Sequence, residues 1–203
     1  MADLTVVGVP GSLRAGSYTR SGVAHALLAA EAEGAEATLL DPQAVELPLY
    51  DPDRGDADAG DAVAVKRRIR EADAVVLGSP VYHGSYSAAF RNVHDYCGFD
   101  EYENTVVGLL TVAGGGSFGP ALEHMRATVR GVHGWVLPYQ VGVRNASDRF
   151  AEADTPVGHL ADGTAVERVV TDDGIADRIE RLGTELVAAA GARPPPAERV
   201  ANG

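Results

Sequence analysis

The chain of 203 residues has little cysteine and little lysine, and it lacks long apolar runs. The single cysteine, Cys97, excludes an intramolecular disulfide and a metal site made of cysteines alone. No apolar run approaches the roughly 20 residues that a membrane-spanning helix requires, and no basic segment precedes the first apolar run. We therefore expect a soluble, cytoplasmic protein in which any redox chemistry comes from a bound cofactor.

Positive charge is also scarce. Seventeen Lys and Arg residues stand against 29 Asp and Glu residues, which gives a net charge of -12. This excess repels phosphate backbones and anionic lipids, so we expect a small-molecule partner and neither nucleic acid nor membrane. Lys66 is the one lysine. An acidic, lysine-poor surface suits a halophilic protein that must remain hydrated at high salt; a genome rich in Ala, Gly and Arg codons is the alternative explanation.

The composition is that of an ordinary globular protein, with 45% hydrophobic and 23% charged residues. A chain of this length is short for two domains, so we predict a single domain over residues 1–191. Residues 192–203 contain three consecutive prolines and few apolar anchors, and we expect them to form a disordered tail.

Short apolar runs alternate with longer helical patterns, which is typical of βαβ units around a parallel sheet. The expected strands cover residues 4–9, 35–40, 74–78, 105–112 and 135–143. The expected helices cover residues 17–33, 61–71, 87–96, 120–132 and 174–190. Segments 41–60 and 145–165 are rich in Asp, Pro and Gly and show neither the helical nor the strand period of apolar residues, so we interpret them as surface excursions. The pattern predicts an α/β fold.

The segment after the first expected strand places glycines, hydroxyls and arginines at the start of a helix. In an open α/β sheet of order 2-1-3-4-5, ligands bind beyond the carboxyl ends of strands one and three. There Ser12, Ser17 and Thr19 can donate to a phosphate while Arg14 neutralises its charge. The spacing matches neither a Walker loop nor Gly-x-Gly-x-x-Gly, and the cysteine nucleophile of a tyrosine phosphatase is missing. The segment fits a phosphate monoester; a serine-capped helix with solvated arginines is the alternative.

Two more segments follow strands at the same sheet edge. Segment 79–86 is stiffened by proline and glycine, offers the flat face of Tyr82 to an aromatic heterocycle, and provides Ser85 as a donor. Segment 113–117 contains three glycines, which let backbone amides approach a ligand closely. Taken alone, Tyr82 could pack its loop onto the core and the glycines could form a plain turn. Together, the three segments predict a ligand site.

These segments resemble the NADPH-dependent FMN reductases of the flavodoxin-like superfamily. The resemblance spans about residues 4–143 and consists of Gly11-Ser12-Leu13-Arg14-x-x-Ser17, Ser79-Pro80-x-Tyr82-x-Gly84-Ser85, Phe90-Arg91-Asn92-x-x-Asp95 and the glycine triplet. It implies a flavodoxin-like three-layer sandwich, with a five-stranded parallel sheet of order 2-1-3-4-5, that holds FMN non-covalently. The FMN-binding residues that it implies are Ser12, Arg14, Ser17 and Thr19 at the phosphate, Pro80, Val81, Tyr82, His83, Gly84 and Ser85 along the isoalloxazine and ribityl chain, and Gly115 and Gly116 at the pyrimidine edge. Thr19 and His83 stand where many members have asparagine, which leaves the redox potential and the substrate range open.

The resemblance also implies an oxidoreductase that takes electrons from NADPH or NADH and passes them through FMN to a small-molecule acceptor, such as a flavin, a quinone or an azo dye. No catalytic side chain is required, because the flavin carries the chemistry. A homodimer or homotetramer is expected, since family members commonly cover the flavin with a neighbouring subunit. The main alternative is a flavodoxin-like FMN electron carrier without NAD(P)H turnover; Arg14 argues against it, because flavodoxin-type loops generally bind phosphate through neutral groups. An FMN-binding module without turnover is a third interpretation.

The remaining histidines and the cysteine give no sign of a metal site. Surface or packing roles are expected for His25, His94, His124 and His133, which lack metal-ligand spacing. Only His83 lies beside the expected flavin. Cys97 is expected to be a small buried side chain.

Overall fold

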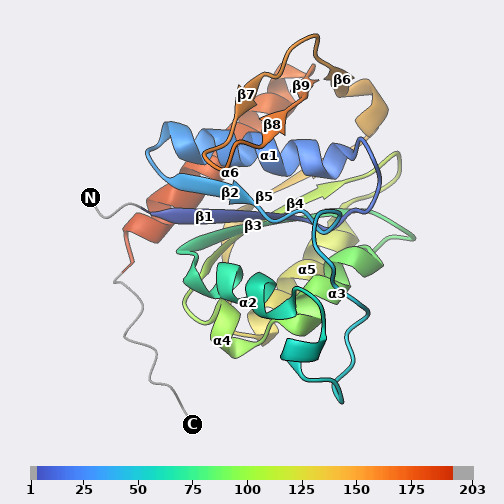
Figure 1. The fold of residues 1–203 in the computed structure, drawn as a ribbon. Helices are drawn as coiled ribbons and strands as arrows, with labels where there is room; N and C mark the ends of the chain where they lie inside the picture. Colours follow the sequence, from blue (N-terminus) through green and yellow to red (C-terminus); the bar gives the residue numbers. More distant parts are fainter. Residues whose placement is uncertain (1–3, 194–203) are drawn as a thin grey trace.

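The computed structural model describes residues 4–193, which form a three-layer α/β sandwich (Figure 1). The central parallel sheet contains β1 (Thr5–Pro10), β2 (Glu36–Leu39), β3 (Ala74–Pro80), β4 (Val106–Val112) and β5 (Trp135–Val143). The strand order is β2-β1-β3-β4-β5. The predicted flavodoxin-like fold class and its strand order are therefore confirmed. Most of the tail expected at residues 192–203 lies outside the described residues.

Helices cover both faces of the sheet (Figure 1). One face carries α1 (Tyr18–Ala32) and α6 (Asp173–Gly191), and the other carries α2 (Ala62–Glu71), α3 (Ala88–Tyr96), α4 (Phe99–Tyr102) and α5 (Gly119–Gly131). Serine side chains cap two helices that begin at the carboxyl edge of the sheet: Ser17 Oγ accepts from the Arg20 amide and Ser87 Oγ accepts from the Phe90 amide. The four-residue helix α4 was not predicted, because a single turn is too short to show a helical period. In the described part of the chain, no helix is long and apolar enough to cross a membrane.

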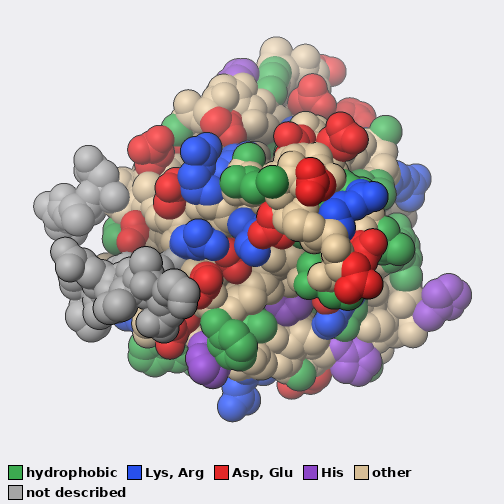
Figure 2. Space-filling model, turned by 60° about the horizontal axis from the view of Figure 1, so that its bottom comes forward, with side chains coloured by type: hydrophobic (Ala, Val, Ile, Leu, Met, Phe, Trp, Pro, Cys, Tyr) green, Lys and Arg blue, Asp and Glu red, His purple; other side chains and the backbone are tan. Residues whose placement is uncertain are grey.

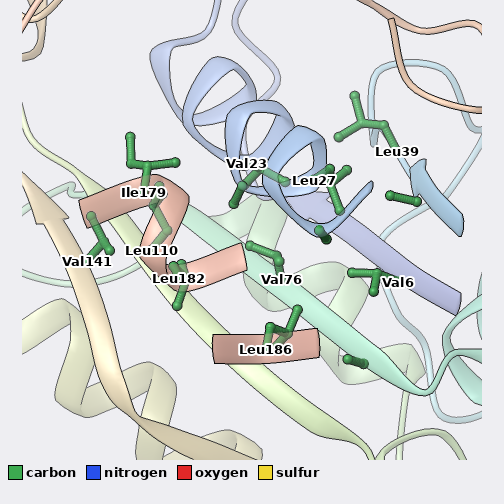
Figure 3. Close-up of a cluster of buried hydrophobic side chains, with 14 of the residues drawn as sticks. Val6, Val23, Leu27, Leu39, Val76, Leu110, Val141, Ile179, Leu182 and Leu186 are labelled. Atoms are coloured by element: carbon green, nitrogen blue, oxygen red, sulfur yellow. The ribbon is translucent and has the colours of Figure 1, made fainter. Parts of the chain in front are cut away.

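The core between the sheet and the α1/α6 layer is made of branched aliphatic side chains that interlock across the two helices (Figure 3). Those at most 1% exposed include Val6, Val23, Leu27, Val76, Leu110, Val141, Ile179, Leu182 and Leu186. Two glycines set the spacing of this layer. A Cβ at Gly8 would lie 2.6 Å from Val23 Cγ1, and a Cβ at Gly183 would lie 2.3 Å from the Ala26 carbonyl oxygen. Both positions therefore need glycine so that α1 can approach β1 and α6.

The two surface excursions differ in structure. Segment 41–60 is irregular as predicted, apart from the 3-10 turn η1 (Asp56–Asp58), and it is held against α3 by Asn92 Nδ2, which donates to the Pro48 carbonyl at 2.9 Å. The prediction for segment 145–165 was wrong in part. After the turn η2 (Ala146–Asp148), the chain forms β6 (Phe150–Glu152), which pairs antiparallel with β9 (Arg168–Val170), and β7 (Gly158–His159), which pairs with β8 (Ala165–Val166). Strands of two or three residues leave no readable alternation in a sequence.

Candidate functional site

Three loops meet at the carboxyl edge of the sheet: the serine loop (residues 10–17) after β1, the tyrosine hairpin (residues 80–87) after β3, and the glycine loop (residues 113–118) after β4. Hydrogen bonds join them. The Gly11 amide donates to the Gly78 carbonyl at 2.7 Å, and the Ser87 hydroxyl donates to the Gly11 carbonyl. The Val81 amide donates to the Val112 carbonyl at 2.9 Å. The three predicted loops therefore form one connected edge.

The serine loop presents hydroxyls at the first turn of α1, where the helix amides and the helix dipole favour an anion. Ser12, Ser17 and Thr19 are at most 4% exposed. Ser12 Oγ accepts from the Arg14 amide at 3.4 Å and Ser17 Oγ accepts from the Arg20 amide at 3.2 Å. Because each oxygen accepts a backbone amide, its own hydrogen can be donated to a phosphate oxygen. The loop fits the predicted phosphate monoester.

Two arginines near this loop differ in their partners. Arg20 Nε lies 2.7 Å from Asp41 Oδ2, so its charge is already balanced. The Arg14 side chain is exposed, while its carbonyl accepts from Gln43 Nε2 at 3.1 Å. Arg14 is therefore the better candidate to neutralise a phosphate, as the sequence predicts. Gln43 was missed, because it belongs to the 41–60 excursion and reaches the loop only through the fold.

A polar cavity of about 360 Å³ opens beside the serine loop, between α1 and the strands of the 145–170 region. It is lined in part by Ser17, Arg20, Asp41 and Arg168. Both guanidinium groups are paired there, since Arg168 forms an ion pair with Glu152 and Arg20 pairs with Asp41. A phosphate bound in this cavity would have to displace the carboxylates of Asp41 and Glu152 from these two guanidinium groups. The cavity is therefore a poorer phosphate site than the edge that carries Ser12 and Arg14.

The tyrosine hairpin is a tight two-residue turn. The Tyr82 amide donates to the Ser85 carbonyl at 2.9 Å, and the Ser85 amide donates to the Tyr82 carbonyl at 3.0 Å. The central residues His83 and Gly84 have φ values of 51° and 79°, the left-handed pair that a type I′ turn requires. Tyr82 is left 54% exposed at the rim. The turn thus presents a flat aromatic face against which a heterocycle can lie.

The glycine loop is open. A Cβ built at Gly114, Gly115 or Gly116 would meet no atom within 4 Å, and Gly116 has a φ of 69°. The loop backbone can therefore approach a planar ligand without side chains between them. Together with the hydroxyls and Arg14 at the phosphate end and Tyr82 at the ring end, this open space fits FMN. The contacts of each predicted residue with FMN remain predictions.

Sequence reasoning also missed His124 on α5, a neighbour of the tyrosine hairpin. Its Nδ1 lies 3.0 Å from Ser85 Oγ, and its ring meets the Tyr86 ring edge-on at a centroid distance of 6.4 Å. The prediction of a plain surface or packing role for His124 therefore left out its contact with a predicted cofactor residue. No local signal could show this contact, because 39 residues separate the two side chains.

The other histidines and the cysteine lie away from these loops or within the core. His25 Nε2 lies 2.7 Å from the Arg168 carbonyl, and burial lowers the pKa of His25. His94 stacks on Phe90, and burial lowers its pKa too. Cys97 is buried as expected, and burial raises the pKa of its thiol. Within residues 4–193, no group of three or more His, Cys, Asp or Glu side chains could hold a metal ion.

The sheet order and the three joined loops define a class: a flavodoxin-like protein with a site for a phosphorylated aromatic cofactor. The chain belongs to the NADPH-dependent FMN reductase family, whose pattern it matches over residues 4–148. This match confirms the predicted family, the FMN cofactor and the NAD(P)H donor.

Named relatives are similar over part of the chain. A NADPH azoreductase of Bacillus sp. (strain OY1-2) is 39% identical over 128 residues, which cover 61% of this chain and 72% of the relative. An FMN-dependent NADPH-azoreductase of Staphylococcus saprophyticus is 39% identical over 100 residues, which cover 49% of this chain and 48% of the relative. The chain thus spans about half the length of the staphylococcal relative.

Solved structures agree with the fold along nearly the whole chain. The flavoenzyme NAD(P)H:(acceptor) oxidoreductase from Paracoccus denitrificans has a TM-score of 0.70 at 22% identity, covering 93% of this chain and 97% of that one. An oxidoreductase from Corynebacterium diphtheriae has a TM-score of 0.71 at 18% identity, covering 94% of this chain and 98% of that one. At these identities the likeness shows the fold.

Proposed function

We propose that this protein is an NAD(P)H-dependent oxidoreductase of the cytoplasm that holds FMN non-covalently at the joined serine, tyrosine and glycine loops and reduces a small-molecule acceptor. The observation that carries the proposal is the combination, at one sheet edge, of buried donors beside the exposed Arg14 with an exposed aromatic face and an open glycine loop. When bound, FMN supplies the transfer of hydride and electrons. The assignment of an enzyme, rather than a carrier, follows the family to which the chain belongs.

In this scheme the residues of the chain bind and orient FMN. Ser12 and Ser17 donate to the phosphate, and Arg14 balances its charge. The type I′ turn holds Tyr82 at the rim of the ring site, and the glycine loop leaves space beside it. With side chains absent from that space, the nicotinamide and the acceptor can use the same open side in turn. No general acid or base of the protein is needed for this exchange.

Turnover tests the proposal. The acceptor class includes azo dyes, because two relatives are named azoreductases, and quinones, because these are flat and accept two electrons. We expect the FMN-loaded protein to oxidise NADPH continuously when an azo dye or a quinone is present, and the rate to be lost when FMN is removed. Protein that binds FMN and yet shows no NADPH oxidation with either acceptor would favour the electron carrier.

We propose that the active species is a homodimer or homotetramer. Leu13 in the serine loop is 65% exposed and Tyr82 in the hairpin is 54% exposed. These apolar side chains border the FMN site and would be covered by a neighbouring subunit. Sedimentation of the FMN-loaded protein distinguishes these assemblies from a monomer.

We propose further that the protein is adapted to high salt. Asp and Glu side chains are spread over the face in Figure 2, among fewer Lys and Arg side chains, in agreement with the net charge of -12. Raising KCl from 0.1 M to 1 M shortens the Debye length from about 10 Å to about 3 Å and screens this repulsion. We expect the melting temperature to rise by about 4 to 8 °C, which corresponds to about 2 kcal/mol for a chain of this size. A melting temperature that stays constant or falls would favour codon bias as the origin of the composition.

A further inference from the structure

We propose that His124 is a positioning residue whose protonation decides whether the Ser85 hydroxyl accepts a hydrogen bond from bound FMN or donates one to it. The inference rests on the proposed function, because it assigns a partner to a predicted FMN-binding residue. It adds a side chain from α5 to a site otherwise built from the three loops.

The contact is well placed to carry this effect. His124 Nδ1 lies 3.0 Å from Ser85 Oγ, and Ser85 is held by two backbone hydrogen bonds to Tyr82. The Tyr86 ring, at an interplanar angle of 82°, borders the imidazole. Because α5 begins directly after the glycine loop, His124 links the tyrosine hairpin to the element that follows β4.

The chemistry follows from the atoms involved. When the imidazole is neutral with its hydrogen on Nε2, Nδ1 accepts from the Ser85 hydroxyl, and only oxygen lone pairs remain for a ligand. When Nδ1 gains a proton from solvent, it donates to Ser85 Oγ and releases the hydroxyl hydrogen toward the ligand. Histidine is the side chain that ordinarily changes charge between about pH 5 and 8. A proton at Nδ1 thus turns Ser85 from an acceptor into a donor.

The charged groups around this contact are largely paired. On α3, Arg91 pairs with Asp95 at 2.6 Å and also hydrogen-bonds to Tyr86. On α5, Glu123 lies 4.0 Å from Arg126. His83, in the turn of the hairpin, is a second histidine at these loops, so it needs a control of its own. These charged neighbours are held by partners of their own, whereas His124 contacts the Ser85 hydroxyl directly.

The flavin ring offers more hydrogen-bond acceptors than donors, so the donor form of Ser85 should bind it better. We therefore expect wild-type protein to gain affinity relative to a His124→Phe variant as the pH falls. Phenylalanine keeps a flat ring against Tyr86 but cannot form the hydrogen bond. The ratio of the two dissociation constants for FMN also cancels the titration of the FMN phosphate itself.

The experiment measures FMN binding by quenching of flavin fluorescence at pH 8.5 and pH 5.5. The ratio of the His124→Phe dissociation constant to that of wild type should lie about three- to tenfold below unity at pH 8.5, because the freed Ser85 hydroxyl can donate to FMN in the variant, and rise to within about twofold of unity at pH 5.5. His133→Asn, which changes an exposed histidine just before β5 and tolerates its left-handed backbone (φ 65°), should give a ratio that does not vary with pH. The comparison is repeated in a His83→Asn background, which keeps a residue tolerant of the left-handed turn, and the ratio should change with pH in the same way.

Ser85→Ala tests whether the effect of His124 depends on the Ser85 hydroxyl. In the Ser85→Ala background, the ratio of the FMN dissociation constants with and without His124→Phe should be the same at pH 8.5 and at pH 5.5. The role of His124 is overturned, while the proposed function stands, by either of two results. One is a ratio that is flat with pH in otherwise wild-type protein; the other is a pH effect that persists without the Ser85 hydroxyl. Failure of folded wild-type protein to bind FMN at either pH would overturn both this role and the proposed function.

Discussion

Gly11→Ala is expected to lower the free energy of unfolding by about 3 kcal/mol and to abolish tight FMN binding. A Cβ at residue 11 would lie 2.4 Å from Phe90 Cβ and 2.8 Å from Phe90 Cα. These are backbone-linked atoms in the first turn of α3, so no side-chain rotation can relieve the overlap. The Gly11 carbonyl also accepts from the Ser87 hydroxyl. Moving the two segments apart would therefore break a bond that joins the serine loop to the tyrosine hairpin.

Urea unfolding of the apoprotein and FMN titration measure the two effects separately. Gly114→Ala is the matched control, because its Cβ would meet no atom within 4 Å, and we expect its stability to stay within about 0.5 kcal/mol of wild type. A Gly11→Ala protein with wild-type stability and FMN affinity would show that the loops can separate without harm. The close approach of α3 would then play no part in building the site.

Arg14→Ala is expected to weaken FMN binding by about 1.5 to 3 kcal/mol, or about 10- to 150-fold, with little change in the stability of the apoprotein. The side chain is exposed, so its removal leaves no buried cavity. Arg20 cannot easily take its place, because Asp41 holds that guanidinium at 2.7 Å. The loss should therefore appear in binding of the phosphate.

Riboflavin makes this test specific, because it carries the same ring without the phosphate. Arg14→Ala should leave riboflavin affinity unchanged, and Arg67→Ala, at an exposed position on α2, should leave the affinity for both flavins unchanged. An equal loss for FMN and riboflavin would mean that Arg14 shapes the loop rather than binding phosphate. Unchanged FMN affinity would move the phosphate to another place.

The central strands β3 and β4 could be predicted because they are buried on both faces. All seven residues of β3 and of β4 are buried, so each strand is a continuous apolar run ended by turn residues. The short strands β6 to β9 and the single turn α4 could not be predicted, since their pairing partners and not their own patterns specify them. The strand predicted over residues 74–78 extends to Pro80, because that residue still pairs in register with Val112.

The loops of the site could be predicted for a related reason. Ligand sites in parallel sheets lie at known strand ends, so the order of the strands along the chain is enough to group Ser12, Tyr82 and the glycine triplet. His124 and Gln43 could not be grouped with them. Each reaches its loop from a distant segment, and a hydrogen bond formed by tertiary packing leaves no local trace in the sequence.

Anaerobic addition of NADPH to the FMN-loaded protein tests the central claim most directly. If the three loops hold FMN with one side open to the nicotinamide, the yellow absorbance of the bound flavin should bleach within seconds, and it should return when a quinone is added. Free FMN at the same concentration, mixed with NADPH alone, is the control for reduction without the protein. Bound flavin that stays yellow after NADPH, in protein that has taken up FMN, would contradict the reductase assignment and identify an electron carrier instead.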